Sequence, residues 1–208
     1  MYRISAFISY SSKEKVIGGK FKSCLENFCG YEAFIAHDDI LGSTIWEDEI
    51  IKSIKNADFF MPLISKEFKE SPFTDQETGI AVCLKKKIIP IKLSEINPYG
   101  FIEKYQALQY KNDVNNLALT IAQIGLIYEP KSSYHQKALN SIVYAFCESM
   151  SFEVANATIQ ILCKCNDLSP NQLTQIVKAI KTNSQIENAY GLNALKECLR
   201  KNYKISID

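Results

Sequence analysis

The chain has 208 residues, of which 47% are apolar and 23% charged, values typical of a globular protein that can bury a core. Its formal net charge is +1, so no overall field favours nucleic acid or an anionic membrane as a partner. Seven cysteines lie scattered without a regular framework, and the first residues run straight into a strand pattern. We therefore expect reduced thiols in a cytoplasmic protein without a targeting segment or membrane span.

Short apolar runs alternate with amphipathic helical stretches over the first 129 residues, which is the pattern of βαβ units around a parallel sheet. Strands are expected at 4–9, 31–35, 57–64, 88–93 and 108–110, and helices at 13–28, 46–56, 72–86 and 114–128. Gly30 is expected to close the first helix, and Ser71-Pro72 to begin the third. Five parallel strands predict an α/β domain of flavodoxin-like type over residues 1–129.

The composition changes after residues 129–133, and only helical periodicity follows. Helices are expected at 134–149, 152–165, 170–182 and 187–201. Ser169-Pro170 is a cap pair for the third of these helices, whereas Gly191 lies inside the last one without an evident reason. No convincing internal repeat is visible. The sequence predicts a small all-helical domain over residues 130–208.

Ligands of an open parallel sheet bind beyond the carboxyl ends of its strands, here the segments 9–12, 36–45, 65–77 and 94–101. No glycine-rich dinucleotide fingerprint or P-loop follows the first strand. The acidic residues that a phosphoacceptor receiver needs there are absent, because that strand ends in Phe7-Ile8-Ser9-Tyr10. The only histidines are His37 and His135, so a metal site is not expected.

Five segments in chain order carry a family resemblance. They are residues 6–10 (Ala-Phe-Ile-Ser-Tyr), 34–50 with the acidic run His37-Asp38-Asp39, 57–65, 71–79 and 88–91. Together they resemble the Toll/interleukin-1 receptor (TIR) domain, in the form found in bacterial antiphage-defence proteins such as the Thoeris subunits. The resemblance implies an NAD+ nucleosidase or ADP-ribosyl cyclase that releases nicotinamide and makes an ADP-ribose-derived, cyclic signal for a downstream effector. It also implies TIR–TIR self-association, with NAD+ as substrate and no cofactor.

The same resemblance makes Glu77 the candidate catalytic residue, and the chemistry supports that role. Cleavage of the nicotinamide–ribose bond develops positive charge on the ribose, which a nearby carboxylate stabilises. Phe73 lies four residues earlier on the same helix face and could pack against the base or the ribose. The alternative is that Glu77 is a helix-surface acid and Phe73 a core residue.

Further substrate-binding candidates follow from their position at the strand ends. They are Phe7, Ser9, Ser11, His37 and Asp38, beside Phe73. At such a position Phe7 is more often a core residue, and the alternative for His37 and Asp38 is that they are turn residues.

Two departures from the family pattern weaken the enzymatic interpretation. NAD-cleaving TIR domains mostly carry Trp where this chain has Phe73, and some animal relatives carry an arginine pair at Ser11-Ser12. Two alternative functions therefore stay open. One is a non-catalytic TIR–TIR interaction or scaffold module. The other is a nucleoside deoxyribosyltransferase, which shares the fold class and a catalytic Glu but not the five segments.

Overall fold

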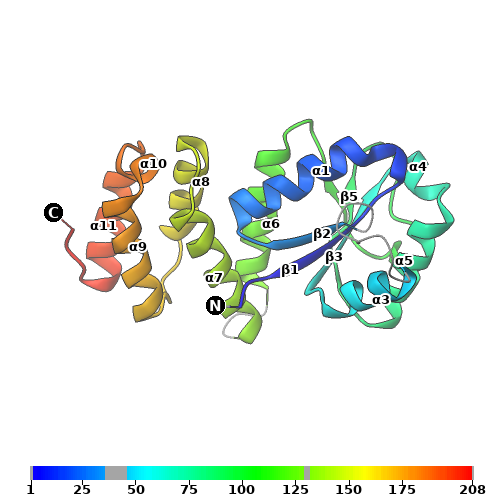
Figure 1. Cartoon of the computed structure of the whole chain (residues 1–208), viewed down its shortest axis with the longest axis horizontal. Coiled ribbons are helices and arrows are strands. Elements are labelled where there is room, and N and C mark those ends of the chain that lie inside the picture. The colour runs from blue at the N-terminus through cyan, green and yellow to red at the C-terminus, as the bar shows by residue number, and fades with distance from the viewer. Residues whose placement is uncertain (1, 36–45, 129–131, 208) are drawn as a thin grey trace. The chain divides into compact units, whose positions relative to one another are not determined.

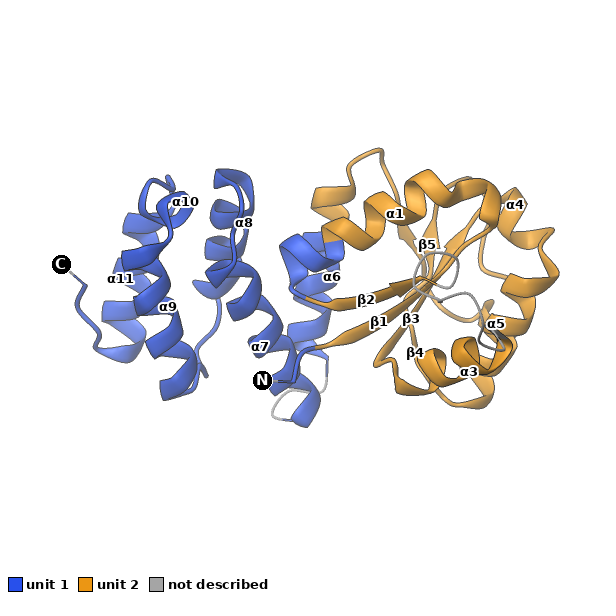
Figure 2. Cartoon of the chain, in the orientation of Figure 1, with its two compact units in different colours: residues 1–3, 25–30, 118–208 blue, residues 4–24, 31–117 orange. Residues whose placement is uncertain are grey.

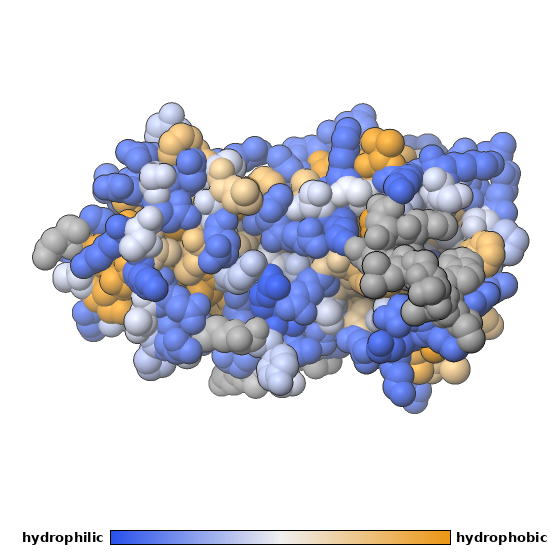
Figure 3. Space-filling view, in the orientation of Figure 1, coloured by the Kyte–Doolittle hydropathy of each residue, from blue (hydrophilic) through white to orange (hydrophobic). Residues whose placement is uncertain are grey.

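The structure is a computed structural model that describes residues 2–35, 46–128 and 132–207 (Figure 1). Two compact units divide the chain (Figure 2). The sheet unit contains residues 4–24 and 31–117, and the helical unit contains residues 1–3, 25–30 and 118–208. The molecular face drawn in Figure 3 is largely hydrophilic, because most large apolar side chains are buried in the two units.

The sheet unit is built on one parallel sheet. Its strands are β1 (Ser5–Ser9), β2 (Glu32–Ile35), β3 (Phe59–Ile64), β4 (Lys87–Ile88), β5 (Ile91–Lys92) and β6 (Leu108–Gln109). The order is β2-β1-β3-β5-β6, and β4 also pairs with β3. Pro90 lies between β4 and β5 and has no N–H to donate, so the predicted fourth strand is split into two short ladders. The five-stranded, flavodoxin-like parallel sheet is confirmed.

Helices cover both faces of this sheet (Figure 1). They are η1 (Ser12–Glu14), α1 (Lys15–Cys24), α3 (Trp46–Asn56), α4 (Lys66–Lys69), α5 (Pro72–Cys83) and η3 (Gly100–Ile102), and α6 (Val114–Ile127) begins in this unit. Pro72 occupies the first turn of α5 as predicted, but the Ser71 side chain makes no capping hydrogen bond. The Thr74 hydroxyl instead donates to the carbonyls of Phe68 (2.6 Å) and Ser71 (2.8 Å).

The core between the sheet and its α3/α5 side is aromatic. The Phe7 ring stacks between Phe34 and Phe60, with ring centroids 5.5 and 5.7 Å apart. Ile54 of α3 and Ala81 of α5 complete this cluster. Every residue of β3 is buried, which agrees with the continuous apolar run that the sequence shows there.

The helical unit holds the remaining elements. They are η2 (Leu25–Cys29), α6 from residue 118, α7 (Ser133–Cys147), α8 (Phe152–Leu162), α9 (Pro170–Thr182), α10 (Ser184–Glu187) and α11 (Leu192–Tyr203). Ser132, Ser151 and Ser169 cap α7, α8 and α9 with their side chains. Ser169 and Gln172 form the reciprocal capping box that begins α9. Among the described residues no helix has the length and apolar composition to cross a membrane.

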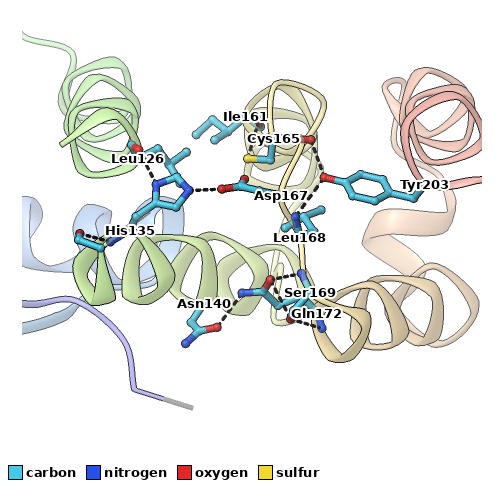
Figure 4. Close-up of polar contacts among 11 residues, drawn as sticks. Leu126, His135, Asn140, Ile161, Cys165, Asp167, Leu168, Ser169, Gln172 and Tyr203 are labelled. Carbon is cyan, nitrogen blue, oxygen red and sulfur yellow. Dashed lines mark hydrogen bonds and ion pairs between the residues drawn. The ribbon is translucent and has the colours of Figure 1, made fainter. Parts of the chain in front are cut away.

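The helices of this unit form two stacked pairs, an arrangement that the sequence did not reveal. Gln172 donates to Asn140 (2.7 Å) and Asn183 donates to the Cys147 carbonyl (3.1 Å), so α7 and α9 run in parallel. Around the first of these contacts, the His135 ring meets the Leu126 carbonyl (2.7 Å) and the Asp167 carboxylate (2.5 Å) (Figure 4). The pair α7–α8 is thus followed along the chain by the pair α9–α11, with α9 beside α7 and α11 beside α8.

The stacking of these helices explains why residue 191 is a glycine. Its N–H donates to Asn156 of α8 (2.8 Å), and a Cβ on it would lie 2.9 Å from Ile159 Cγ2. The residue sits at the start of α11, so the last helix begins at Leu192 rather than at the predicted residue 187. A close approach of two helices therefore requires the glycine.

The two compact units do not have the predicted boundary between residues 129 and 130. Residues 25–30 belong to the helical unit, where Leu25, Phe28 and Cys29 are buried. The Cys29 thiol donates to the Ala118 carbonyl (3.0 Å) in the same unit. Gly30 ends this segment with φ +66°, as its expected capping role requires. Local periodicity finds the helix that contains these residues but not the unit that buries them.

Candidate active site

A buried carboxyl lies where the first strand ends. Ser9 is the last residue of β1, and its side chain points to the same side of the sheet as Phe7, two residues earlier. Thr74, Glu77 and Ala81 form the inward face of α5, at helical spacing. The Ser9 hydroxyl donates a 2.5 Å hydrogen bond to Oε2 of Glu77. Glu77 is only 7% exposed, so it is not a helix-surface acid.

The surroundings of Glu77 keep its charge poorly stabilised. Burial raises the pKa of Glu77 to about 7, and the hydrogen bond from Ser9 offsets part of that rise. Removal from water disfavours the carboxylate, and one hydroxyl donor restores only some of the lost solvation. Near neutral pH the residue therefore exists in both protonation states. Such a carboxyl can stabilise a developing cation or exchange a proton.

Phe73 lies one helical turn before Glu77 and is 53% exposed. A large part of its ring is open to a ligand, so the alternative that Phe73 is a core residue does not apply. Ser11 is buried at the cap position of η1, where its carbonyl accepts from the Glu14 N–H (2.7 Å) and its side chain makes no capping bond.

The expectation for Phe7 needs correction. Its ring has no exposed surface and fills the aromatic core, so it has no face to offer a substrate. His37 and Asp38 lie outside the described residues. Of the candidate residues, the structure brings Ser9 and Glu77 into contact and places Phe73 on the helix that carries Glu77.

Two further features at this edge of the sheet were missed by the sequence analysis. Glu14, just after β1, has a pKa raised by burial, although the Ser65 hydroxyl binds and partly stabilises its carboxylate. The Tyr99 hydroxyl donates to Asp75 (2.8 Å), and its ring meets Phe68 edge-on. The hydrogen bond from Tyr99 to Asp75 fastens the segment after β5 to the first turn of α5. Of these residues, Glu14 alone lies outside the segments that the strand ends had marked, and Ser65, Phe68, Asp75 and Tyr99 lie within them.

The parallel sheet in the order β2-β1-β3-β5-β6, with a buried carboxyl beyond the end of β1, defines a flavodoxin-like α/β protein with a candidate active site. Residues 6–122 match the TIR domain family, and the chain therefore belongs to that family. No curated protein matches the chain.

The solved structures that are similar to this chain include two proteins of different kinds. One is the TIR domain of the Toll-related receptor TRR-2 from Hydra magnipapillata, with 17% identity and a TM-score of 0.49 over 56% of this chain and 92% of that one. The other is the CMP N-glycosidase BcmB from Clostridium botulinum, with 21% identity and a TM-score of 0.40 over 56% of this chain and 97% of that one.

Proposed function

We propose that the chain is an enzyme that cleaves the bond between nicotinamide and ribose in NAD+, with Glu77 as the catalytic carboxylate. The observation that carries this proposal is the burial of Glu77 beyond the end of β1, with the Ser9 hydroxyl on its carboxylate. Across the part of the chain that the structure describes, Glu77 has no ion-pair partner. A buried acid without a compensating cation costs stability, which supports a functional role.

The chemistry suits an ionised Glu77. Nicotinamide is a cation in NAD+, and the electron pair of the breaking bond moves onto its ring nitrogen, so the base leaves neutral. Positive charge then develops on the ribose, where a carboxylate in a site of low dielectric stabilises it strongly. No acid is needed for the leaving group. The deprotonated form of Glu77 is therefore the active one, and Ser9 acts as a positioning residue that holds it in place.

Phe73 supplies a surface for the flat parts of the substrate. Its half-exposed ring lies on the turn before Glu77, so a base stacked on it would bring the neighbouring ribose to the carboxylate. The alternative function, a non-catalytic TIR–TIR interaction module, draws its support from the same residue. Phe has less stacking area than the Trp expected from the family and lacks its indole N–H.

The biological part of the proposal rests on family membership and on the bacterial character of segments 34–50 and 71–79. The product would be an ADP-ribose derivative, cyclic or linear, that signals to a downstream effector in antiphage defence. Self-association through TIR–TIR contacts would assemble the active form.

The test is nicotinamide release from NAD+ by purified protein at high concentration with a crowding agent. Wild type is compared with Glu77→Ala and Glu77→Gln, and with Glu70→Gln as a control on an exposed glutamate nearby. We expect wild type and Glu70→Gln to release nicotinamide, and both folded Glu77 variants to lose roughly 100-fold or more. Mass detection identifies the second product. Wild type that releases nothing under every assembly condition would favour the interaction module.

A further inference from the structure

Three of the seven cysteines gather near one end of α8 and beside α11. Cys163 directly follows α8, Cys165 lies two residues further on, and Cys198 belongs to α11. All three carry free thiols. Cys163 and Cys198 are partly exposed, whereas Cys165 is buried. None of them belongs to the candidate active site.

The two helices are held side by side by polar contacts at both ends. At one end the Gly191 N–H donates to Asn156 (2.8 Å). At the other end Asn202 donates to Asn166 (3.0 Å), and the Tyr203 hydroxyl donates to the Cys165 carbonyl (2.8 Å) (Figure 4). These contacts restrict sliding of α11 along α8, so residues between them keep fixed neighbours.

Cys163 and Cys198 are such neighbours. The polar contacts set the register of the two helices, since they join residues 35 or 36 positions apart, and the same offset places Cys163 beside Cys198. The two side chains are close enough for Cys198 to raise the pKa of Cys163. Both side chains are partly open to a small molecule in solution. A disulfide between them would join elements that are already adjacent.

We propose that Cys163 and Cys198 form an intramolecular disulfide that fastens α11 to α8 when the protein meets a small-molecule disulfide such as oxidised glutathione. In the first step the Cys198 thiolate attacks one sulfur of the oxidant, and one molecule of the small thiol leaves. In the second step the Cys163 thiolate attacks the Cys198 sulfur of the mixed disulfide, and a second small thiol leaves. The two protein thiols are oxidised, and both electrons pass to the oxidant.

The order of attack follows from the surroundings of Cys163. Burial and the neighbouring Cys198 raise the pKa of Cys163 to about 12, so this thiol keeps its proton at neutral pH. Attack by Cys163 is therefore the slow second step at neutral pH, and closure of the disulfide is faster in alkaline buffer, because the thiolate is the nucleophile. Cys165 does not compete, since it is buried and donates to the Ile161 carbonyl. Burial, followed by the nearby Asp167, also raises the pKa of Cys165 to about 12.

The experiment maps disulfides in the whole purified chain. Reduced protein is incubated anaerobically with oxidised glutathione at pH 7.5 and 8.5, quenched with acid and alkylated under denaturing conditions. We expect the monomer to lose two of its seven alkylatable thiols, with a peptide pair joined through Cys163 and Cys198 and faster formation at pH 8.5. Cys163→Ser and Cys198→Ser should each abolish this product, while Cys147→Ser should retain it.

The wild-type map decides the proposal even where a variant folds poorly. Seven alkylatable thiols after prolonged incubation would overturn it, as would a bond between Cys163 and Cys165 or products that contain only glutathione mixed disulfides. As an independent readout, oxidised wild type should show slower amide exchange in α11 than reduced wild type. Equal exchange rates in the two forms would contradict the fastening of α11.

Discussion

The hydroxyl of Ser9 and the carboxylate of Glu77 join two elements that lie 68 residues apart in the chain, over a donor–acceptor distance of 2.5 Å. Ser9 ends a buried strand and Glu77 occupies the inner face of α5, so neither side chain can turn towards bulk water without leaving the other. Among the residues that the structure describes, this hydrogen bond is the contribution that lowers the otherwise raised pKa of Glu77. The state of this one carboxyl therefore connects fold, stability and proposed activity.

The first prediction concerns Ser9→Ala. A hydrogen bond to a charged group contributes roughly 1.5–3 kcal/mol, so its loss should raise the midpoint of the pH–activity profile by about one to two units. Because the ionised form is active, nicotinamide release at pH 7 should fall about tenfold and recover in part near pH 9. Initial rates between pH 5.5 and 9.5 measure this shift. Ser12→Ala, on the exposed neighbour, should keep the wild-type midpoint, and an unshifted midpoint in Ser9→Ala would contradict the positioning role.

The second prediction concerns stability against pH. The pKa of Glu77 rises from 4.5 to about 7 on folding, so between these values the native state binds more protons than the unfolded state. Stability must then fall as the pH rises from 4.5 to 7, by on the order of 3 kcal/mol, and this term is constant outside that window. Glu77→Gln lacks the term. The free energy of unfolding, measured with urea at pH 5 and pH 8, should rise for Glu77→Gln relative to wild type at the higher pH. If the free energies of both proteins change equally with pH, Glu77 is not a buried acid with a raised pKa.

The sequence predicted well those elements whose hydrophobic pattern can be recognised from their own residues alone. The helix at 46–56 and the strands at 4–9 and 57–64 agree with α3, β1 and β3 to within two residues. The strand around Pro90 was predicted as one piece, because an apolar run carries no information on which amides must pair. The helical pattern of 13–28 likewise did not indicate that its last part, η2, is a π-helix.

The candidate site was predictable in part. Glu77 and Phe73 were found through the family resemblance, and Ser9 through its place at a strand end. The contact between Ser9 and Glu77 depends on how α5 packs against β1, which no local pattern encodes. Phe7 was misjudged as a substrate-binding residue for the same reason, since alternation in a strand separates two faces without saying which residue of a face reaches solvent. The helix pairs α7–α8 and α9–α11 have the same arrangement in the fold, but their sequences show no visible repeat.

The third prediction concerns the exposed ring of Phe73. Phe73→Ala should raise the KM for NAD+ roughly tenfold, because a stacked aromatic contributes about 1–3 kcal/mol to binding a base. Phe73→Trp should lower the KM by restoring stacking area. Since 53% of the Phe73 residue is solvent-exposed, we expect only a small change in thermal stability for either variant. Michaelis–Menten kinetics with a melting curve for each variant separate the two effects, and a KM unchanged in both would remove Phe73 from the binding site.

The fourth prediction compares two glycines in different settings. Gly30 has φ +66°, and a Cβ there would lie 1.9 Å from the Ser141 carbonyl oxygen, which belongs to the backbone of α7. Gly30→Ala should therefore cost at least about 2 kcal/mol, the sum of the left-handed conformation and the displacement of a helix. Gly19 lies inside α1, and a Cβ on it would meet nothing within 4 Å, so Gly19→Ala should stabilise the protein by about 0.5–1 kcal/mol. Thermal unfolding followed by circular dichroism measures both, and a Gly30→Ala variant that melts with wild type would show that η2 and α7 are not packed as described.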